Sequence, residues 1–413
     1  MVASIETCRS CSSPEITPIL SLGDQYITNF LSDGQEKNQG VKVPLETVLC
    51  GDCKLLQLRH NAPPEEMWGD QYWYKSGISS TIRKDLEDIV NKSKKLKVLG
   101  RGDFVVDIGS NDGTLLDFYG PDVVSVGFEP SKNVAKEAEN KGHTIFNDFF
   151  NYERFEERFF NQKAKIITAI SMFYDLEDPN KFLRDAASLL DDDGLFVIQQ
   201  NYLVTMLEQN AFDNISHEHR EYYSLNSLNH LLKRHDLEVF DVEQNGINGG
   251  SIRTYIRKKG SNLEGFPDAE KRVDSLLERE DVLGLNTLKP YQDFAGRISG
   301  IKDELMSFIV REKSKGRKIG IYGASTRGNV ALQYFGLNPE LIEAIADKNP
   351  DKWGRKTVGS LIPIISPEEM RIRNPDYLLV NTWHFFDEVK EQENAYHDAG
   401  GRFVTALPYF RVE

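Results

Sequence analysis

Apolar runs alternate with amphipathic stretches through the middle of the chain. Four of these runs predict buried parallel strands, because a strand covered on both faces has few polar positions: Phe104–Ile108, Val123–Phe128, Lys165–Ile170 and Leu195–Gln199. Apolar residues at helical spacing predict helices at Ser79–Lys97 and Asn180–Leu190. Strands and helices in this order predict an α/β fold with a doubly wound sheet and helices on both of its faces.

A second α/β unit is predicted near the end of the chain. Its first strand leads into a glycine turn, and later strands are expected at Glu343–Ala346 and Tyr377–Asn381. The stretch Gly260–Gly316 is charged and helical in pattern and connects the two units. We therefore expect three parts: a small cysteine-containing module at 1–66, a central domain with its helical connector at 67–308, and a C-terminal α/β domain at 309–413.

The overall composition excludes some classes of function. The 413 residues carry a net charge of −14, whereas a protein that binds nucleic-acid backbone needs a basic face. A nucleic-acid partner is therefore not expected, although one local basic pocket for a diphosphate is compatible with this charge. The chain has no apolar run long enough to cross a bilayer, and Met1–Glu6 lacks the features of a secretory signal. We expect a cytoplasmic protein without a membrane partner.

All four cysteines of the chain lie within its first 53 residues, in two C-x-x-C pairs. Each pair lets one tight turn present two thiolates to the same ion, and two such turns complete the tetrahedral shell that structural zinc prefers. The predicted ligands are Cys8, Cys11, Cys50 and Cys53. The alternative is four unrelated buried cysteines. A closed four-thiolate shell has no position for substrate, so the expected metal holds the module together and does no chemistry.

The turn after the first central strand predicts a cofactor site. Glycines let the backbone approach a ligand, and a carboxylate at the end of the next strand can accept the hydroxyls of an adenosine ribose. The candidates are Asp107, Gly109, Asn111, Asp112, Gly113, Glu129 and Asp148. Their order resembles the class I methyltransferase pattern for S-adenosylmethionine. The alternative is a dinucleotide fold, but the turn lacks the G-x-G-x-x-G spacing that admits a pyrophosphate.

A polar segment after the fourth strand contains two histidines, His217 and His219, on either side of Glu218. General acid–base catalysis is one interpretation, since histidine has the side-chain pKa nearest to neutrality. Two alternatives stay open at this point. On an extended strand the two histidines share a face and could hold a metal, and the segment could also be a solvated polar turn.

These motifs together resemble the sugar C-methyltransferase family that acts on nucleotide-linked 4-keto-deoxyhexoses. The resemblance covers nearly the whole chain and rests on both C-x-x-C pairs and on six further motifs: Tyr72-Trp-Tyr-Lys-Ser-Gly77, Val106-Asp-Ile-Gly109, His217-Glu-His219, Asn248-Gly-Gly-Ser251, Gly323-Ala-Ser-Thr-Arg-Gly328 and Thr382-Trp-His-Phe385. It implies a zinc-binding N-terminal module, a class I methyltransferase domain and a Rossmann-like C-terminal domain. A zinc ion and S-adenosylmethionine are the implied cofactors.

The resemblance also implies roles for individual residues. His219 is the implied base that removes the proton at sugar carbon C3, and Glu218 is its helper. A phenol or imidazole then donates to the C4 oxygen as charge develops there, and the tyrosine candidates are Tyr72, Tyr74, Tyr174 and Tyr222. The chain departs from the antibiotic-sugar members at Ser216, where a tyrosine is common, and within Ser171–Leu176, where an active-site histidine is replaced. These departures concern the identity of the sugar.

Polar residues elsewhere are candidates for substrate binding in a monomeric enzyme: Ser76, Asn201, His217, Asn248, Arg253 and Arg327. Arg253 is expected to meet the diphosphate, and Arg327 of the C-terminal domain to lie near the phosphates. Bound NAD is not expected in that domain, because Ala324-Ser325 replaces the G-x-G core. Three other functions stay open: methylation of a sugar hydroxyl, RNA binding by a vestigial methyltransferase fold, and oxidation of a nucleotide sugar.

Overall fold

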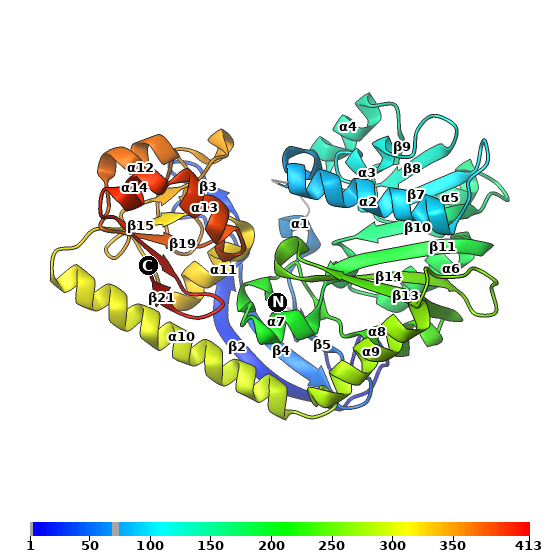
Figure 1. The fold of residues 1–413 in the computed structure, drawn as a ribbon, viewed down its shortest axis with the longest axis horizontal. Coiled ribbons are helices and arrows are strands. Elements are labelled where there is room, and N and C mark those ends of the chain that lie inside the picture. The colour runs from blue at the N-terminus through cyan, green and yellow to red at the C-terminus, as the bar shows by residue number, and fades with distance from the viewer. Residues whose placement is uncertain (1–2, 68–73) are drawn as a thin grey trace.

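The computed structural model describes residues 3–67 and 74–413. Three sheets carry the fold, and they follow one another along the molecule in Figure 1. None of the described helices is long and apolar enough to cross a membrane. Tyr72, one of the tyrosine candidates, lies outside the described residues.

The central sheet has seven strands in the order β13-β14-β11-β10-β7-β8-β9. Its neighbours are parallel except where β14 pairs with β11 and with β13. The predicted strands are confirmed within a few residues. The bounds are β7 Phe104–Ile108, β8 Val124–Phe128, β9 Thr144–Phe146, β10 Ala164–Ile170, β11 Leu190–Asn201, β13 Leu237–Asn245 and β14 Ser251–Lys258.

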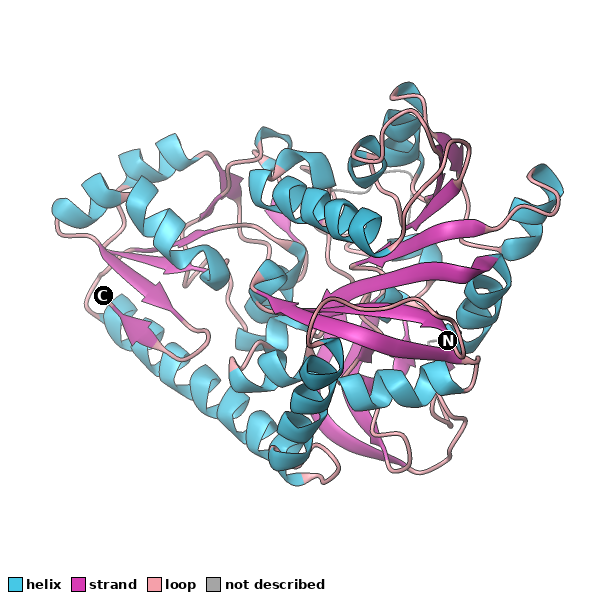
Figure 2. Cartoon of the chain, turned by 45° about the vertical axis from the view of Figure 1, so that its right-hand side comes forward, coloured by secondary structure: helices cyan, strands magenta, loops and turns pink. Residues whose placement is uncertain are grey.

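Helices cover both faces of this sheet, as the predicted alternation requires (Figure 2). Val105 packs under α2, α3 and α4, whereas its neighbour Val106 faces α5, α6 and α8, because successive strand residues point to opposite faces. The bounds are α2 Ser80–Leu96, α3 Thr114–Asp117, α4 Lys132–Asn140, α5 Tyr152–Arg158, α6 Pro179–Leu189, α7 Leu203–Glu208 and α8 Leu225–Lys233. The fold is therefore the α/β class that the sequence predicts.

The N-terminal module contributes a four-stranded sheet of order β12-β5-β4-β2, of which β12 comes from the central part of the chain. The bounds are β2 Ile16–Tyr26, β4 Lys42–Cys50, β5 Leu56–Leu58 and β12 Glu221–Tyr222. A further short strand, β3 (Phe30–Leu31), pairs with β17 (Lys356–Thr357) of the C-terminal domain. This module is thus bonded through its backbone to both of the other parts. Two more short strands, β1 (Ala3–Ser4) and β6 (His60–Asn61), pair within it, and α1 (Pro64–Met67) follows.

Two helices connect the central and C-terminal domains, namely α9 (Ala269–Val282) and α10 (Lys289–Ser314). The long helix α10 runs along one side of the molecule and packs against α7 and β2 (Figure 1). Its buried face, with Phe294, Ile298 and Leu305, belongs to a core that continues into the C-terminal sheet.

The C-terminal sheet has the order β18-β16-β15-β19-β20-β21, parallel except for β21. The strand bounds are β15 Ile319–Tyr322, β16 Ile345–Ala346, β18 Ile364–Ile365, β19 Tyr377–Val380, β20 Arg402–Thr405 and β21 Arg411–Val412. The helix bounds are α11 Thr326–Phe335, α12 Pro367–Arg373, α13 Phe386–Gln392 and α14 Asn394–Asp398. A second α/β unit at this place is the predicted arrangement.

Candidate active site

A cavity of about 360 Å³ opens at the carboxyl edge of the central sheet. The strand order reverses between β7 and β10, and ligands of open α/β sheets bind at such a switch point. Residues within the last three positions of β7, β8, β10 and β11, or directly after these strands, line the cavity, among them Gly109, Glu129, Ser171 and Gln199. Its size is that of a small-molecule site.

The first wall of the cavity is the turn after β7. Gly109 has φ 73°, Asn111 has φ 49° and Gly113 has φ 76°, so this turn uses left-handed backbone three times. The Asn111 backbone N–H donates to Glu129 Oε2 at 3.0 Å, and the Ser131 N–H donates to Glu129 Oε1 at 2.8 Å. Burial raises the pKa of Glu129, and it raises the pKa of Asp107 to about 7.

These residues fit the S-adenosylmethionine that the sequence pattern predicts. Each oxygen of Glu129 accepts one backbone N–H and keeps a second lone pair, which suits the two hydroxyls of a ribose. Ser110 Oγ and Asp175 Oδ1 are buried and have no hydrogen-bond partner within the described part of the chain. Both residues line the cavity, Ser110 with its Oγ packed against Gly127 of β8.

Three other cofactor candidates lie outside the cavity lining. Asp112 accepts the N–H and the hydroxyl of Thr114 and also the Gly77 N–H at 2.9 Å, so it joins the turn to the short helix η1 (Ser76–Ile78). A Cβ on Gly113 would lie 2.9 Å from the Cβ of Ala138, so this glycine is needed for packing against α4. Asp148 is exposed, and its Oδ1 accepts the backbone N–H of Phe149 at 2.8 Å.

His219 lies just beyond the cavity lining, against the η2 segment Phe173–Asp175. Its ring meets that of Tyr174 edge-on at a centroid distance of 4.4 Å. His219 Nδ1 is 2.7 Å from the Asn214 carbonyl oxygen, which can only accept, so Nδ1 carries the proton and Nε2 keeps its lone pair. Burial, opposed by the Asn214 hydrogen bond, lowers the pKa of His219 to about 4, and the ring is neutral at pH 7.

The other two residues of the triplet have different surroundings. His217 donates from Nε2 to the Val43 carbonyl of β4 at 3.0 Å, and burial lowers its pKa to about 4. It therefore joins the N-terminal sheet and does not face the cavity. Burial raises the pKa of Glu218 to about 7. The two histidines do not form a metal site, since the four cysteines are the one metal-binding group among the described His, Cys, Asp and Glu residues.

The tyrosine candidates differ in what their hydroxyls can reach. Tyr74 lines the cavity and is 47% exposed. Tyr174 is buried against His219. Tyr222 donates to the His219 carbonyl oxygen at 2.8 Å, so its hydroxyl is committed to holding the triplet.

The substrate candidates divide in the same way. Ser76 and Asn248 line the cavity. Asn201 donates to Asn214 Oδ1 at 2.8 Å, and the backbone carbonyl of the same Asn214 accepts the hydrogen bond from His219. Arg327 donates to the Asn248 carbonyl at 2.8 Å and pairs with Asp213 at 3.0 Å, so it lies between the domains.

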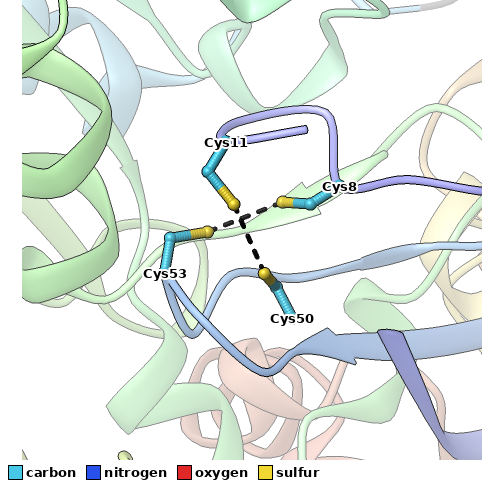
Figure 3. A group of neighbouring side chains, drawn as sticks. All are labelled: Cys8, Cys11, Cys50 and Cys53. Carbon is cyan, nitrogen blue, oxygen red and sulfur yellow. Dashed lines mark hydrogen bonds between the residues drawn. The ribbon is translucent and has the colours of Figure 1, made fainter. Parts of the chain in front are cut away.

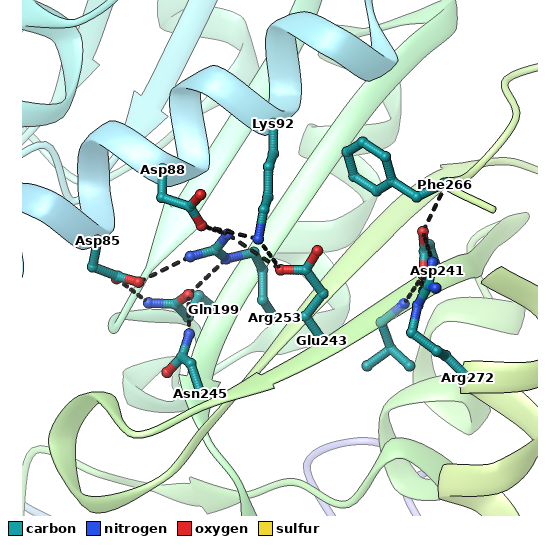
Figure 4. Close-up of polar contacts among 11 residues, drawn as sticks. Asp85, Asp88, Lys92, Gln199, Asp241, Glu243, Asn245, Arg253, Phe266 and Arg272 are labelled. Carbon is teal, nitrogen blue, oxygen red and sulfur yellow. Dashed lines mark hydrogen bonds and ion pairs between the residues drawn. The ribbon is translucent and has the colours of Figure 1, made fainter. Parts of the chain in front are cut away.

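The expectation that Arg253 meets a diphosphate is corrected by its surroundings. Arg253 is 1% exposed, pairs with Asp85, Asp88 and Glu243, and donates from Nε to Gln199 Oε1 at 2.8 Å (Figure 4). These acceptors occupy its guanidinium within the protein, so we do not retain it as a phosphate ligand.

The same network contains two cavity residues that the sequence reasoning missed. Asp85 and Gln199 line the cavity, and Gln199 Nε2 donates to Asp85 Oδ2 at 2.5 Å. Asp85 follows Ile82 by three residues and precedes Ile89 by four, so a carboxylate on the apolar face of a predicted helix was the available signal.

The four cysteines lie close together (Figure 3). Cys50 is the last residue of β4, at the opposite end of this strand from Val43, the partner of His217. Their Sγ atoms all lie within 4.8 Å of one another, and the pairs Cys8–Cys53 and Cys11–Cys50 are 3.5 Å apart. A tetrahedral zinc ion with Zn–S bonds of about 2.3 Å separates its sulfurs by about 3.8 Å, so the arrangement fits zinc. Gln57 Nε2 donates to Cys8 Sγ at 3.2 Å and orients that ligand.

Side chains of the C-terminal domain itself pack against and hydrogen-bond to its glycine turn. Asp347 accepts the Ala324 N–H at 2.8 Å, and a Cβ on Gly328 would lie 2.1 Å from Asn381 Nδ2. The carboxylate at the ribose position accepts backbone N–H groups much as Glu129 does, but Asp347 also pairs with Lys352 at 3.4 Å, so a cation of the chain already faces it.

Comparisons with known proteins agree with this arrangement. Family models match a zinc binding domain at residues 8–68, a methyltransferase domain at 79–242 and a C-methyltransferase C-terminal domain at 246–408. C-methyltransferase NovU of Streptomyces niveus is 31% identical over 417 residues, which cover 100% of this chain and 98% of NovU.

Solved methyltransferase structures cover less than half of this chain, with low TM-scores. An S-adenosylmethionine-dependent methyltransferase of Clostridium acetobutylicum is 16% identical, with a TM-score of 0.35 over 43% of this chain and 92% of its own. Magnesium protoporphyrin IX methyltransferase of Synechocystis, solved with bound SAM, is 12% identical, with a TM-score of 0.33 over 47% of this chain and 89% of its own. On the full-length match to NovU and the three family models, the chain belongs to the C-methyltransferase family and is an S-adenosylmethionine-dependent methyltransferase with a zinc-binding N-terminal module.

Proposed function

We propose that this enzyme methylates carbon C3 of a nucleotide-linked 4-keto-6-deoxy sugar, with His219 as the base. The observation that carries the proposal is the tautomer of His219. The hydrogen bond from Nδ1 to the Asn214 carbonyl leaves Nε2 as a neutral acceptor beside the cofactor cavity. The relative NovU is a C-methyltransferase, which supports carbon as the acceptor atom.

The chemistry requires two groups of the protein. A hydrogen on the carbon next to a ketone is acidic only because the anion is an enolate, so a base and a donor to the C4 oxygen are needed. His219 Nε2 takes the proton, and the C–H electron pair moves into the C3–C4 bond while negative charge develops on the C4 oxygen. The Tyr74 hydroxyl is the donor that we favour for this oxygen, because Tyr74 lines the cavity.

The cofactor supplies an electrophilic methyl group when it is bound. Glu129 would hold its ribose, and the turn from Asp107 to Asn111 would hold its amino-acid end. The protein then contributes mainly position, by holding the acceptor carbon in line with the methyl group. After transfer, the proton on His219 returns to solvent. Glu218, with its raised pKa, is the helper we propose for that proton.

The test is mass spectrometry and NMR of the purified enzyme with S-adenosylmethionine and a panel of nucleotide-linked 4-keto-6-deoxyhexoses in deuterium oxide. We expect a product one methyl group heavier with a new C–CH₃ signal, and deuterium beside the ketone in recovered substrate. An O–CH₃ signal would show hydroxyl methylation instead. Neither mass gain nor exchange with any member would contradict the proposed substrate class.

The cofactor site makes a separate prediction. Glu129→Gln removes the charge that receives the ribose hydroxyls, and we expect the Kd for S-adenosylmethionine to rise about 10- to 100-fold, because hydrogen bonds to charged groups contribute about 1.5–3 kcal/mol. Isothermal titration calorimetry measures this change. Asp148→Asn, at an exposed carboxylate outside the cavity, is the matched control and should bind as the wild type does. Equal affinities in both variants would contradict the site.

The acidic net charge of −14 agrees with a substrate that is not nucleic acid. A monomer in the cytoplasm remains part of this proposal.

A further inference from the structure

We propose that Asp213 is a positioning residue through which the C-terminal domain holds the catalytic base His219 in place. This inference rests on the proposed role of His219. It assigns a function to the contact between the two domains at Asp213, a residue that belongs to neither the sequence motifs nor the cavity lining.

The Asp213 carboxylate contacts two side chains of the C-terminal domain. It lies on the short helix η3 (Phe212–Asn214) and is 2% exposed. Its Oδ2 accepts the indole N–H of Trp383 at 3.2 Å and pairs with Arg327 Nη2 at 3.0 Å. Trp383 belongs to η6 (Trp383–Phe385) and Arg327 to α11, so both partners come from the C-terminal domain.

The next residue along the chain bonds the base. The Asn214 carbonyl oxygen accepts the Nδ1 proton of His219 at 2.7 Å, and the Asn214 side chain accepts from Asn201 at 2.8 Å. Asp213 and Asn214 are consecutive residues of η3, whose backbone is held by the hydrogen bonds from the Asn214 N–H to the Ala211 carbonyl at 3.1 Å and from the Ile215 N–H to the Phe212 carbonyl at 2.8 Å. A displacement of Asp213 therefore moves the short helix that carries the acceptor of His219. The C-terminal domain is thus one residue away from the hydrogen bond that fixes the tautomer.

Arg327 connects the same point to the cofactor cavity. Its Nη1 donates to the carbonyl oxygen of Asn248, a residue that lines the cavity. One guanidinium therefore contacts both η3 and the hairpin loop η4 (Ile247–Gly249). Docking of the C-terminal domain fixes the base and one cavity wall together.

A purely stabilising role would not require this chemistry. A buried ion pair is weak evidence for stability, and its best-attested use is to fix one arrangement among several. A base must also be placed closely, since a misplacement of about 1 Å can cost about 10²-fold in rate. The ion pair Asp213–Arg327 lies next to the residue that accepts the His219 hydrogen bond, so a change in this pair is expected to misplace the base.

The charges around His219 give the inference a specific signature. The positive charge of Arg327 lowers the pKa of His219, and the negative charge of Asp213 raises it. The other groups nearby are the Tyr174 ring, which packs against the imidazole, and Glu218, the preceding residue. His384 of η6 faces the same Asp213–Arg327 pair, whose two charges shift its pKa in the same directions. Asp213→Asn should therefore lower the pKa of His219, and Arg327→Gln should raise it.

The experiment combines kinetics with ¹⁵N NMR of histidine-labelled full-length enzyme. For Asp213→Asn we expect kcat to fall about 10- to 100-fold, while the KM for S-adenosylmethionine stays within about twofold. The His219 signals, assigned by comparison with His219→Asn, should lose the single Nδ1-protonated form, and its pKa should move in opposite directions in Asp213→Asn and Arg327→Gln. Trp383→Phe removes one N–H donor and should lower kcat about threefold to tenfold.

Arg297→Met is the matched control. Arg297 of α10 donates to Asn210 and to the Leu207 carbonyl, both at 2.7 Å, so it makes a comparable contact close to η3 without touching Asp213. Its kcat and His219 spectrum should match the wild type.

Two results would overturn the inference. One is an active wild-type enzyme in which Asp213→Asn and Trp383→Phe both keep the wild-type kcat and tautomer. The other is an equal loss in Arg297→Met, or pKa shifts of the same sign in the two charge variants, since either would indicate general loosening of the interface. A wild-type enzyme without methyl transfer or deuterium exchange would instead contradict the proposed function itself.

Discussion

Replacing His219 by asparagine is expected to lower the turnover of methyl transfer about 10²- to 10⁴-fold, the range that a general base contributes. Asparagine cannot take the substrate proton at the position of Nε2, but its amide can still donate toward the Asn214 carbonyl that now receives Nδ1. The fold and the Kd for S-adenosylmethionine should therefore stay close to those of the wild type. Single-turnover kinetics and calorimetry measure the two quantities separately.

His217→Leu is the contrasting variant, because His217 lies two residues away and donates to Val43 of the N-terminal sheet, a hydrogen bond that leucine cannot make. We expect it to lower the free energy of unfolding by about 1–3 kcal/mol, the usual effect of a broken buried hydrogen bond, with turnover retained by the folded enzyme. Wild-type turnover in His219→Asn, or equal losses of turnover in both variants, would rule out His219 as the base.

The pH dependence follows from the same geometry. Because the pKa of His219 is lowered to about 4, the base is neutral above about pH 5 and is lost only as the pH falls through that value. In the deuterium-exchange measurement, proton abstraction by His219 should persist through neutral pH and decrease toward pH 4, whereas the release of that proton through Glu218 should change near pH 7, where this carboxyl titrates. An unperturbed histidine would lose this activity near its ordinary pKa of about 6.5.

The backbone could be predicted from the sequence to a large extent. The strand predicted at Phe104–Ile108 has the bounds of β7, and the helix predicted at Ser79–Lys97 contains α2. Buried parallel strands and amphipathic helices have distinct hydrophobic periods, so local patterns are sufficient to find them. The predicted cysteine cluster is confirmed for a similar reason, since each C-x-x-C spacing places two thiols in one turn.

The hydrogen-bond and ion-pair partners of the polar side chains could not be predicted in this way. Arg253 and Arg327 are equivalent in a sequence, yet Arg253 is enclosed by carboxylates and Arg327 bridges two domains. Tyr222 likewise donates to the backbone of His219, although its place beside the triplet suggested chemistry. Such partners come from elements far apart in the chain, and local periodicity carries no information about them.

The pairing of the N-terminal sheet with distant strands was also beyond local patterns. β12 adds to β5 and β17 pairs with β3 across 164 or more residues of sequence: Glu221 with Gln57, and Lys356 with Leu31. Short strands of two residues have no usable period, so only the folded chain shows them. As a result the zinc module supports the H-E-H triplet directly, through β12 and through His217.

This support makes the effect of Cys50→Ser large. Cys50 is fully buried at the end of β4, and one lost thiolate opens the four-sulfur shell. Structural zinc contributes about 10–16 kcal/mol in zinc-finger peptides, which exceeds the whole stability of many domains. We expect the variant to be insoluble, or to lack zinc, unfold at a much lower temperature and show no methyl transfer, because β4 and β5 hold the triplet. Metal analysis, thermal unfolding and turnover measure these effects.

Asp52→Ser is the control that isolates the thiolate, because Asp52 is exposed in the same C-x-x-C turn and the new side chain is identical. It should bind one zinc ion per chain and unfold at the wild-type temperature. A Cys50→Ser protein that is soluble, free of metal and fully active would show that the zinc site does not organise the catalytic segment. A zinc-free protein that still binds S-adenosylmethionine but has lost methyl transfer would locate the damage at the triplet, since the cofactor cavity is built on β7 and β8, whereas the triplet lies just before β12, which pairs with β5 of the zinc module.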